Sequence, residues 1–541
     1  MENNLWRREK RFDIFVDLLD PSLPYETVYD SQIEGAKHRF HGKQYEPTKS
    51  DQVSALFRAA GNREFKEKKW RVAMEYYNRS LIFAETNSDI VSLAYANRSA
   101  CFFHMQKYDH CFRDIELAIE HNYPKRLMHK LDDREAECVK HLNEKNVDRE
   151  LIEPKLSYDP DEKFPCMANV LEIKTNHRFG RYIEAKCDID VGQTVLVEKG
   201  FVHVFEASDR TLCVTCMRHV QNFIPCGGCT DAMFCDETCM KNNDTHRIAC
   251  GAAFNRIPGN VRYWAESILI AINAFPSVEH LMEFVEDQLT LPKTEMPKNC
   301  SDAQMQYGLF LKLDRMGHDK DIYQNMLKYV TYKLLMAIPA IGEKFTTKKK
   351  QRFLMHLIWQ HKNIADRSAF VQPLADADAR NSFDAGSQII ATCNIFGLFN
   401  HSCIPNLFND FVGNKQILIT TRPVKKGDQL FVCYEQHLWS KSAVQRREHL
   451  KSVYNFNCKC ARCKQQFVND ISMQTDPMYL CIEQSRGKTI SDARREILKK
   501  MCYDFMRKYA HVACANEILV VTVQLMLFLQ DDYPEYRKII T

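Results

Sequence analysis

Apolar residues recur at helical spacing from Asp51 onward, and the pattern repeats. Equivalent positions, such as Trp70 and Tyr108, lie 38 residues apart. A repeat of this kind predicts stacked helical hairpins that bury a common apolar seam. A further helix at about 125–141 would cap the hairpins, although a plain helical bundle fits the same pattern. Residues 1–50 are mixed in character and predict no element.

The pattern changes after the helical repeats. Residues 145–165 are charged and contain three prolines, which favours a linker. Short strands bounded by turn residues are predicted at 170–173, 194–197, 416–420 and 429–433. The stretches 252–370 and 466–541 are helical by pattern. The sequence therefore predicts an α+β protein of several domains, of which the N-terminal one is all-α.

The composition is that of an ordinary folded protein. The chain has 541 residues, of which 45% are hydrophobic and 27% charged, with a net charge of +4. This length accommodates several buried cores, and this charge is too small to indicate a nucleic-acid partner. The start of the chain lacks an apolar signal core, and the longest nearly apolar run, 518–529, is too short to span a bilayer. No membrane partner is therefore expected.

Cysteine usage points to a reducing compartment. The chain has 22 cysteines and no secretory signal, so clustered cysteines are expected to be metal ligands rather than disulfides. Cytoplasmic and nuclear residence follows as an expectation. The basic run 348–352 is a candidate nuclear import signal, although such runs are usually solvated surface.

Eight metal-ligand residues are concentrated between positions 213 and 250. They are Cys213, Cys216, Cys226, Cys229, Cys235, Cys239, His246 and Cys250. Eight thiolate and imidazole ligands suit two tetrahedral zinc ions of structural type, each contributing about 10–16 kcal/mol to local folding. Closed sites leave no open position for hydrolytic chemistry. A RING finger is the competing interpretation, but its histidine placement and its closing Cys-x2-Cys do not match.

A second cluster stands near the C-terminal end and supplies only three ligands, Cys458, Cys460 and Cys463. Upstream of it, residues 400–406 read Asn-His-Ser-Cys-Ile-Pro-Asn. These two motifs together resemble the SET domain of protein-lysine methyltransferases, and the eight upstream ligands resemble a MYND finger. With the helical repeats, the chain resembles the SET-and-MYND (SMYD) family, in the branch that carries tetratricopeptide repeats.

The resemblance implies an α+β multidomain fold. Tetratricopeptide-like helical repeats precede a β-rich SET core with a pseudoknot, which is split by the finger and a helical insert and followed by a helical segment. The expected divisions are the N-terminal region 1–50, helical repeats 51–144, linker 145–165, N-terminal SET part 166–205, MYND finger 206–251, helical SET insert 252–385, catalytic SET core 386–440, post-SET zinc segment 441–465 and C-terminal helical segment 466–541.

The resemblance also implies how three zinc ions are held. MYND fingers interleave their sites, so one ion is assigned to Cys213, Cys216, Cys235 and Cys239. The other ion of the finger is assigned to Cys226, Cys229, His246 and Cys250. In SET proteins of this family the cysteine of the Asn-His-Ser-Cys motif completes the last cluster, so the third ion is assigned to Cys403, Cys458, Cys460 and Cys463.

The implied activity is methyl transfer from S-adenosylmethionine to lysine side chains of histone or other proteins, with a role in transcription. A free lysine has a pKa of about 10.4, so only about one in a thousand is neutral near pH 7. A narrow aromatic channel desolvates the ammonium and lowers that pKa, and alignment of the reactants can supply about 7–11 kcal/mol of the barrier.

Family positions map onto this chain residue by residue. Tyr434 and Tyr454 are the candidate catalytic residues of the lysine channel. The candidate cofactor contacts are Gly180, Arg181, Asn381, Ser382, Asn400, His401, Tyr434 and Phe456. Each residue has a simpler reading, because a tyrosine in an apolar strand usually belongs to the core and an asparagine can cap a turn. Tyr182 stands where many SET domains have glycine, which would narrow the cofactor loop.

The alternative function is a catalytically weak adaptor or corepressor. MYND fingers of this family dock proline-containing peptides, and tetratricopeptide arrays hold peptides in a concave groove. Such modules would recruit histone deacetylases or a chaperone. Direct binding of nucleic acid has little support, because Arg218, Lys241 and Arg247 form only a sparse basic set.

Overall fold

The computed structural model describes most of the chain. The described residues are 48–144, 153–177, 179–206, 212–218, 222–252, 259–292, 295–297, 299–300, 302–314, 322–373 and 388–533. The N-terminal region expected at 1–50 lies almost wholly outside this part, and so do the candidate cofactor residues Asn381 and Ser382. The described residues combine helices with short strands, so the mixed α and β class is confirmed.

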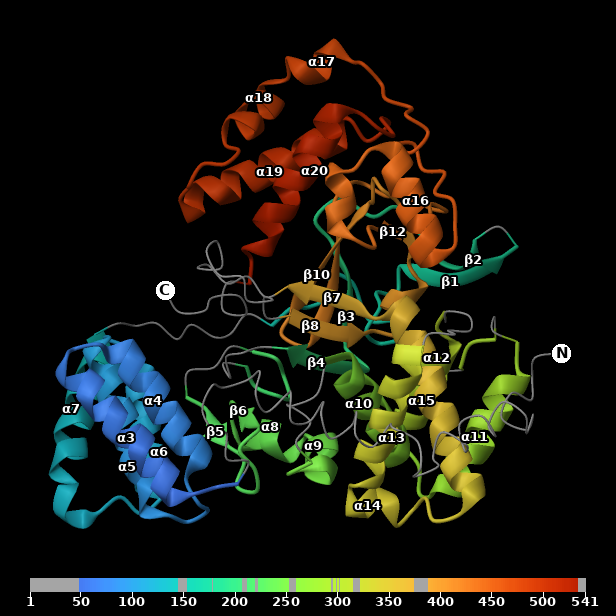
Figure 1. Ribbon diagram of the computed structural model, residues 1–541. Helices are drawn as coiled ribbons and strands as arrows, with labels where there is room; N and C mark the ends of the chain where they lie inside the picture. The colour runs from blue at the N-terminus through green and yellow to red at the C-terminus, as the bar shows by residue number, and fades with distance from the viewer. Residues whose placement is uncertain are drawn as a thin grey trace.

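The first described part is a helical array, blue to cyan in Figure 1. Its elements are α3 (Asp51–Lys66), α4 (Trp70–Phe83), α5 (Asp89–His104), α6 (Tyr108–Glu120), η1 (Lys125–Leu127) and α7 (His129–Glu144). The starts of α3 and α5, and those of α4 and α6, keep the 38-residue spacing of the sequence. Ser50 and Ser88 cap α3 and α5 by accepting a backbone hydrogen bond from the first turn. Ala73, Tyr77 and Ile115 are buried in the shared seam.

The finger and the helical insert come after the strands of residues 171–206 in the chain. Figure 1 places the finger between the array and the insert. The finger contains β5 (Ile224–Pro225), β6 (Met233–Phe234), α8 (Glu237–Lys241) and α9 (Asp244–Ala249). The insert contains α10 (Gly259–Asn273), α11 (Val278–Thr290), α12 (Ala303–Lys312), α13 (Ile322–Met336), α14 (Pro339–Gly342) and α15 (Lys348–Ser368). Trp264 and Phe353 are fully buried in a core that α10, α13 and α15 share.

The remaining strands form small sheets, most of them at the centre of the molecule (Figure 1). They are β1 (Leu171–Asn176), β2 (Gly180–Ala185), β3 (Thr194–Lys199), β4 (Val202–Glu206), β7 (Phe370–Pro373), β8 (Gln388–Thr392), β9 (Asn400–His401), β10 (Leu407–Val412), β11 (Lys415–Thr420) and β12 (Phe431–Val432). β1 and β2 form a hairpin to one side of the others, and two three-stranded antiparallel sheets have the orders β10-β11-β3 and β4-β8-β7. β9 and β12 pair in parallel, which brings the Asn-His motif beside the end of the core.

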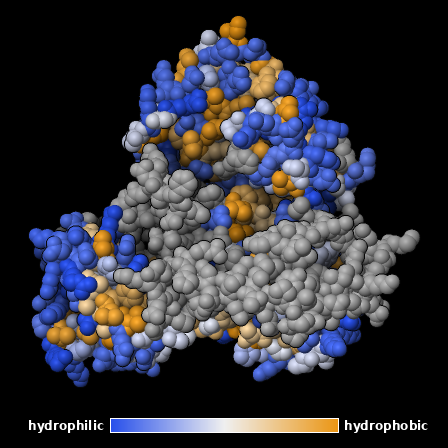
Figure 2. All heavy atoms as spheres, viewed as in Figure 1, coloured by the Kyte–Doolittle hydropathy of each residue, from blue (hydrophilic) through white to orange (hydrophobic). Residues whose placement is uncertain are grey.

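Short helices complete the chain, coloured orange to red in Figure 1. They are η3 (Phe396–Leu398), η4 (Gln436–Ser440), α16 (Ala443–Tyr454), α17 (Ile471–Gln474), α18 (Pro477–Gln484), α19 (Asp492–Lys508) and α20 (Asn516–Gln530). α19 and α20 bury Phe505 and Leu525 in one cluster with Phe408 and Ile417 of the sheet, so the last helices cover β10 and β11. Figure 2 shows apolar atoms exposed among hydrophilic ones over this part of the molecule.

Two further expectations concern connections and membranes. Residues 153–165, within the predicted linker, form no helix or strand, but Ser157 N–H donates to the Thr194 carbonyl (2.9 Å) and Phe164 is buried. Among the described residues no single helix is long and apolar enough to cross a membrane, and only the bent pair α10 and α11 meets the criteria of length and composition together.

Candidate active site and metal centres

The parallel pairing of β9 with β12 brings together residues that are distant in the sequence. Asn400 lies opposite Phe431, and His401 lies opposite Val432. The Tyr434 N–H donates to His401 Nδ1 at 3.1 Å, immediately beyond the paired strands. The structure therefore places three of the candidate site residues, Asn400, His401 and Tyr434, in one spot.

Asn406, the last residue of the same motif, fastens this arrangement. Its Nδ2 donates to the Gln429 carbonyl at 3.0 Å, and its Oδ1 accepts the Phe431 N–H at 2.7 Å. The Asn406 side chain thus binds the backbone of Gln429 and Phe431 as a neighbouring strand would. The sequence analysis quoted Asn406 but gave it no role.

His401 has a buried, neutral ring that is hydrogen-bonded at both nitrogens. It is only 7% exposed, and burial lowers the pKa of its ring to about 4. Because Nδ1 accepts the Tyr434 N–H, the ring proton lies on Nε2, which donates to Cys403 Sγ at 3.2 Å. The ring therefore links the Tyr434 backbone to the last cysteine cluster.

Aromatic rings pack around the Tyr434 ring. The ring centroid of Tyr434 lies 4.9 Å from that of Tyr454, 5.2 Å from that of His401 and 6.3 Å from that of Phe456. The Tyr434 hydroxyl donates to the Phe399 carbonyl at 3.1 Å. Burial raises the pKa of both tyrosines, so both hydroxyls stay protonated near neutral pH. Both tyrosines are half-buried.

The start of β2 completes one side of the site. Asn400 Nδ2 donates to the carbonyls of Phe179 (3.4 Å) and Arg181 (3.3 Å), and Gly180 between them has a φ of +65°. A positive φ is accessible to glycine without strain, so Gly180 allows the hairpin turn to meet Asn400.

Alternation along β2 determines which side chains face inward. Ile183 is fully buried, so Arg181 lies on the core face and Tyr182 on the opposite face. Burial lowers the pKa of Arg181, while the Asp314 carboxylate acts in the opposite direction. The Tyr182 hydroxyl donates to Glu184 at 3.4 Å along the outer face. The Tyr182 side chain therefore lies on the face of β2 opposite to Arg181. In this position it does not narrow the space beside Arg181, as its bulk had suggested.

Three charged residues near the site escaped the sequence analysis because no motif marks them. Arg367, at the end of α15, donates to the Val453 carbonyl (2.8 Å) beside Tyr454. Glu435, next to Tyr434, pairs with His449 at 2.8 Å.

The third missed residue, Glu198 on β3, is fully buried and accepts the backbone N–H groups of Ile395 and Phe396, both at 2.8 Å. It anchors the turn that leads to Phe399 and Asn400. Burial raises the pKa of Glu198 to about 7.

The structure also gathers the three groups of candidate metal ligands. In each group the four ligand atoms lie within 4.8 Å of one another. The groups are Cys213, Cys216, Cys235 and Cys239; Cys226, Cys229, His246 and Cys250; and Cys403, Cys458, Cys460 and Cys463. These are the three sets that the sequence analysis assigned, with the interleaved order in the finger.

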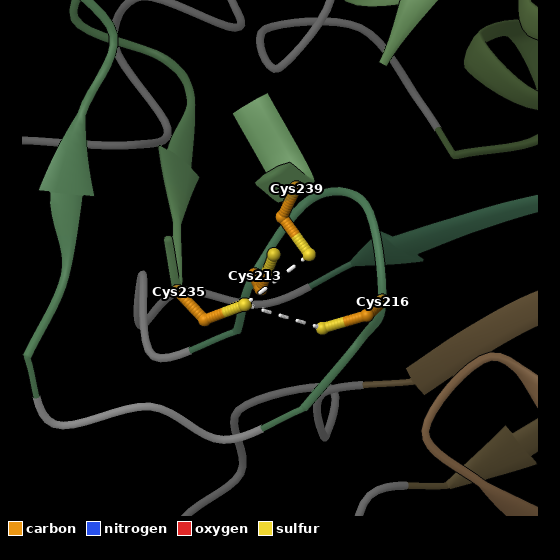
Figure 3. Close-up of side chains that lie close together, drawn as sticks. All are labelled: Cys213, Cys216, Cys235 and Cys239. Carbon is orange, nitrogen blue, oxygen red and sulfur yellow. Dashed lines mark hydrogen bonds between the residues drawn. The ribbon is translucent and has the colours of Figure 1, made fainter. Parts of the chain in front are cut away.

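The distances within the groups fit zinc. Tetrahedral zinc with bonds to sulfur of about 2.3 Å separates two sulfurs by about 3.8 Å. Cys216 and Cys235 are 3.7 Å apart, and Figure 3 shows the thiols of this group converging on one point. The Sγ atom of Cys403 lies 3.9 Å from that of Cys458 and 3.5 Å from that of Cys463. The soft thiolate donors and this spacing fit a zinc ion at each of the three sites.

Helix caps hold two of the finger ligands in place. Asp236 caps α8 by accepting the Cys239 N–H at 2.6 Å. Asn243 caps α9 by accepting the His246 N–H at 2.9 Å. A cap fixes the first turn of a helix, so each ligand is presented from a rigid position.

Comparisons with known proteins agree with this geometry. Residues 266–435 match the SET domain family. The protein-lysine N-methyltransferase SMYD4 of Mus musculus is 21% identical over 98% of this chain and 79% of its own length. The protein-lysine N-methyltransferase SMYD4 of Pongo abelii is 23% identical over 76% of this chain, which spans 66% of that relative.

A SET and MYND domain-containing protein of Dictyostelium discoideum is 23% identical over 54% of this chain and 80% of its own length. A solved structure of the LSMT SET domain bound to lysine and AdoHcy matches 73% of this chain and 89% of its own at 12% identity. Its TM-score of 0.25 is too low to support a shared fold.

Proposed function

We propose that this chain, which belongs to the SET and MYND domain-containing (SMYD) family of protein-lysine N-methyltransferases, transfers methyl groups from S-adenosylmethionine to lysine side chains of proteins. The observation that carries the proposal is the meeting of Asn400, His401 and Tyr434 through the parallel β9–β12 pair. Tyr454 and Phe456 complete an aromatic wall around that point.

The residues on one side of the site suit the cofactor. S-adenosylmethionine supplies an electrophilic methyl group on its sulfonium. Arg181 offers a guanidinium on the inward face of β2 for a carboxylate. Asn400 offers its Oδ1 as an acceptor, because its Nδ2 donates to two carbonyls of the β2 turn and so holds the turn in place. Phe456 offers a ring face on which a base can stack. We assign these residues to cofactor binding together with Gly180 and the His401 backbone.

The tyrosines suit the lysine. Because the Tyr434 hydroxyl donates its hydrogen bond to the Phe399 carbonyl, the lone pairs on its oxygen remain to accept an N–H from an arriving amine. The rings of Tyr434 and Tyr454 replace water around the amine, which lowers its pKa and favours the neutral, nucleophilic form. Holding that nitrogen in line with the methyl group provides the main rate advantage.

Three zinc ions have a structural part in this proposal. The ion at Cys403, Cys458, Cys460 and Cys463 would fasten the segment after α16 to the Asn-His-Ser-Cys motif. Tyr454 and Phe456 immediately precede that segment, so the ion would set their distance from Tyr434. The two finger ions would hold a module that has little core of its own.

The finer assignments rest on the family resemblance. We assign the expected segment boundaries, the MYND character of the finger and its docking of proline-containing peptides to the same proposal. Histone or other protein targets, a role in transcription, and residence in the cytoplasm and nucleus belong to it as well.

Radiolabelled methyl transfer tests the proposal. Zinc-loaded full-length protein is incubated with methyl-labelled S-adenosylmethionine and a mixture of histones and cell-extract proteins. We expect label on lysine in at least one protein band, and its loss with Tyr434→Phe. Absence of both transfer and cofactor binding by the zinc-loaded protein would contradict the proposal.

A further inference from the structure

A segment of the finger lies in the helical array as a bound peptide would. Phe223 is 1% exposed and packs with Ile82 and Phe83 of α4 and with Met233. Ile224 is 7% exposed and belongs to the apolar cluster of the array itself. Figure 1 shows β5 beside the array. The two apolar side chains are therefore anchors in the core of a neighbouring module.

A buried ion pair beneath Phe223 is completed by this segment. Arg98 on α5 and Asp114 on α6 are both 0% exposed and form two hydrogen bonds of 2.7 Å. Arg98 also donates to Asn78 at 2.8 Å, and its last two N–H groups reach the Phe223 carbonyl at 3.3 and 3.4 Å. A guanidinium has five N–H groups, and a buried one left unsatisfied is costly. The array alone satisfies three of them, so the site requires an incoming carbonyl.

The neighbouring asparagine is recognised on both sides of its amide. Asn222 Nδ2 donates to Asp114 Oδ1 (2.7 Å) and to the His110 carbonyl (2.8 Å). The Asn222 Oδ1 accepts a hydrogen bond from His110 Nδ1. Further along the segment, Thr86 donates to the Gly227 carbonyl at 2.8 Å. Asparagine amide, aromatic side chain and backbone carbonyls are thus each matched by a group of the array.

We propose that this groove, formed by Asn78, Thr86, Arg98, His110 and Asp114, is a recognition site for protein segments that carry an asparagine followed by an aromatic residue. In the resting protein its ligand is the chain's own segment 222–227. The array is therefore fastened to the finger, and a partner segment with asparagine followed by an aromatic residue has to displace the internal segment to enter this groove.

Tethering makes the internal ligand hard to displace. A linked segment acts at an effective concentration of about millimolar or more, so a peptide supplied at micromolar concentration competes poorly. Removing the Asn222 amide and the Phe223 ring should loosen the segment and open the groove without changing its walls. The proposal concerns the array and the finger, so its outcome is independent of methyl transfer.

Fluorescence anisotropy with full-length, zinc-loaded protein tests the proposal. The probe is a labelled synthetic peptide with the sequence of residues 222–227, carrying Cys226→Ser. The double variant Asn222→Ala/Phe223→Ala should bind this peptide saturably, and at least about tenfold more tightly than the wild type. Adding His110→Ala should weaken binding, whereas the exposed control His129→Ala should not.

Equal binding by wild type and double variant, or no binding by a correctly metal-loaded double variant, would overturn the proposal. Should the double variant fail to load its metals, Asn222→Ala alone keeps the test open, because it removes no apolar anchor. Amide hydrogen exchange should then accelerate in α5 and α6 around Arg98 and Asp114. Unchanged exchange in both helices would also overturn the proposal.

Discussion

At the scale of single residues, the site depends on how each polar group is already committed. The His401 ring is occupied at both nitrogens, by the Tyr434 backbone and by Cys403. The Tyr434 hydroxyl keeps its proton and donates it in a hydrogen bond to the Phe399 carbonyl. These commitments leave only lone pairs on the Tyr434 oxygen to face an incoming amine. In the proposed reaction this residue would act as the acceptor that positions the lysine nitrogen.

Replacing Tyr434 by phenylalanine should reduce kcat about 100-fold, because the amine loses its positioning partner. The loss of one buried hydrogen bond should lower the free energy of unfolding by about 1 kcal/mol. Tyr509→Phe is the control, since that hydroxyl is also hydrogen-bonded, to Ser472 O at 3.2 Å and to Asp476 Oδ2 at 3.1 Å, but lies in the C-terminal helices. The control should lose at least as much stability, because one of its partners is a carboxylate, and should keep its kcat. Equal kcat in the two variants would remove Tyr434 from the reaction.

At the scale of elements, the short parallel pair of β9 and β12 is held from two sides. Asn406 accepts the N–H of Phe431 in β12, and Glu198 accepts the N–H of Ile395 in the turn before β9. The cluster at Cys403 ties it to the segment after α16. The pair has only two residues in each strand, so these outside contacts determine its position.

Cys403→Ser should lower the zinc content by one equivalent, from three to two per chain, because a hydroxyl replaces a thiolate ligand. Methyl transfer should fall in parallel, since Tyr454 and Phe456 lose their anchor. Metal analysis by mass spectrometry measures the first effect. The exposed Cys187→Ser lies outside all three clusters and should retain three equivalents. An unchanged zinc content in Cys403→Ser would contradict the assignment of the third site.

The buried Glu198 predicts a pH dependence of stability. Its folded-state pKa of about 7 lies above the ordinary value of 4.5, so the folded protein keeps a proton that the unfolded chain loses in this window. Stability should therefore fall as the pH rises from about 4.5 to 7, by up to about 3 kcal/mol. Denaturant unfolding of wild type and Glu198→Gln, compared at each pH, isolates this group.

As the pH rises across that window, the unfolding free energy of the wild type should fall relative to that of Glu198→Gln. The surface control Glu162→Gln should show no comparable slope. A difference that stays constant between pH 5 and pH 8 would show that the Glu198 carboxyl is not the cause.

At the scale of the whole molecule, the parts meet through short, specific contacts. The array contacts the finger at Asn222 and Phe223, and the sheet packs against the last helices at Phe408. Arg507 of α19 also pairs with Asp190 at 2.9 Å, in the turn before β3. The last helices are therefore fixed to the sheet, and the array is fixed to the finger.

The sequence was sufficient where local chemistry decides the structure. The helices α10, α13, α19 and α20 lie within the stretches 252–370 and 466–541 that were predicted to be helical, because apolar spacing is a local signal. The three ligand groups followed from cysteine spacing combined with the family resemblance.

Contacts between distant segments carried no such signal. The sheet of β4, β8 and β7 joins strands across the whole insert, and its strands have only four or five residues each. Arg367 and Glu435 enter the site through the ends of α15 and β12, and nothing in their neighbourhood marks them. The docking of Asn222 on Asp114 likewise depends on two modules meeting in space.

Calorimetric titration of zinc-loaded full-length protein with S-adenosylmethionine tests the central claim most directly. The wild type should bind one equivalent, and Asn400→Ala should bind at least about tenfold more weakly, since the amide at the β2 turn is lost. The exposed Asn273→Ala should bind as the wild type does. No heat of binding in the wild type, or equal affinity in Asn400→Ala, would contradict the account.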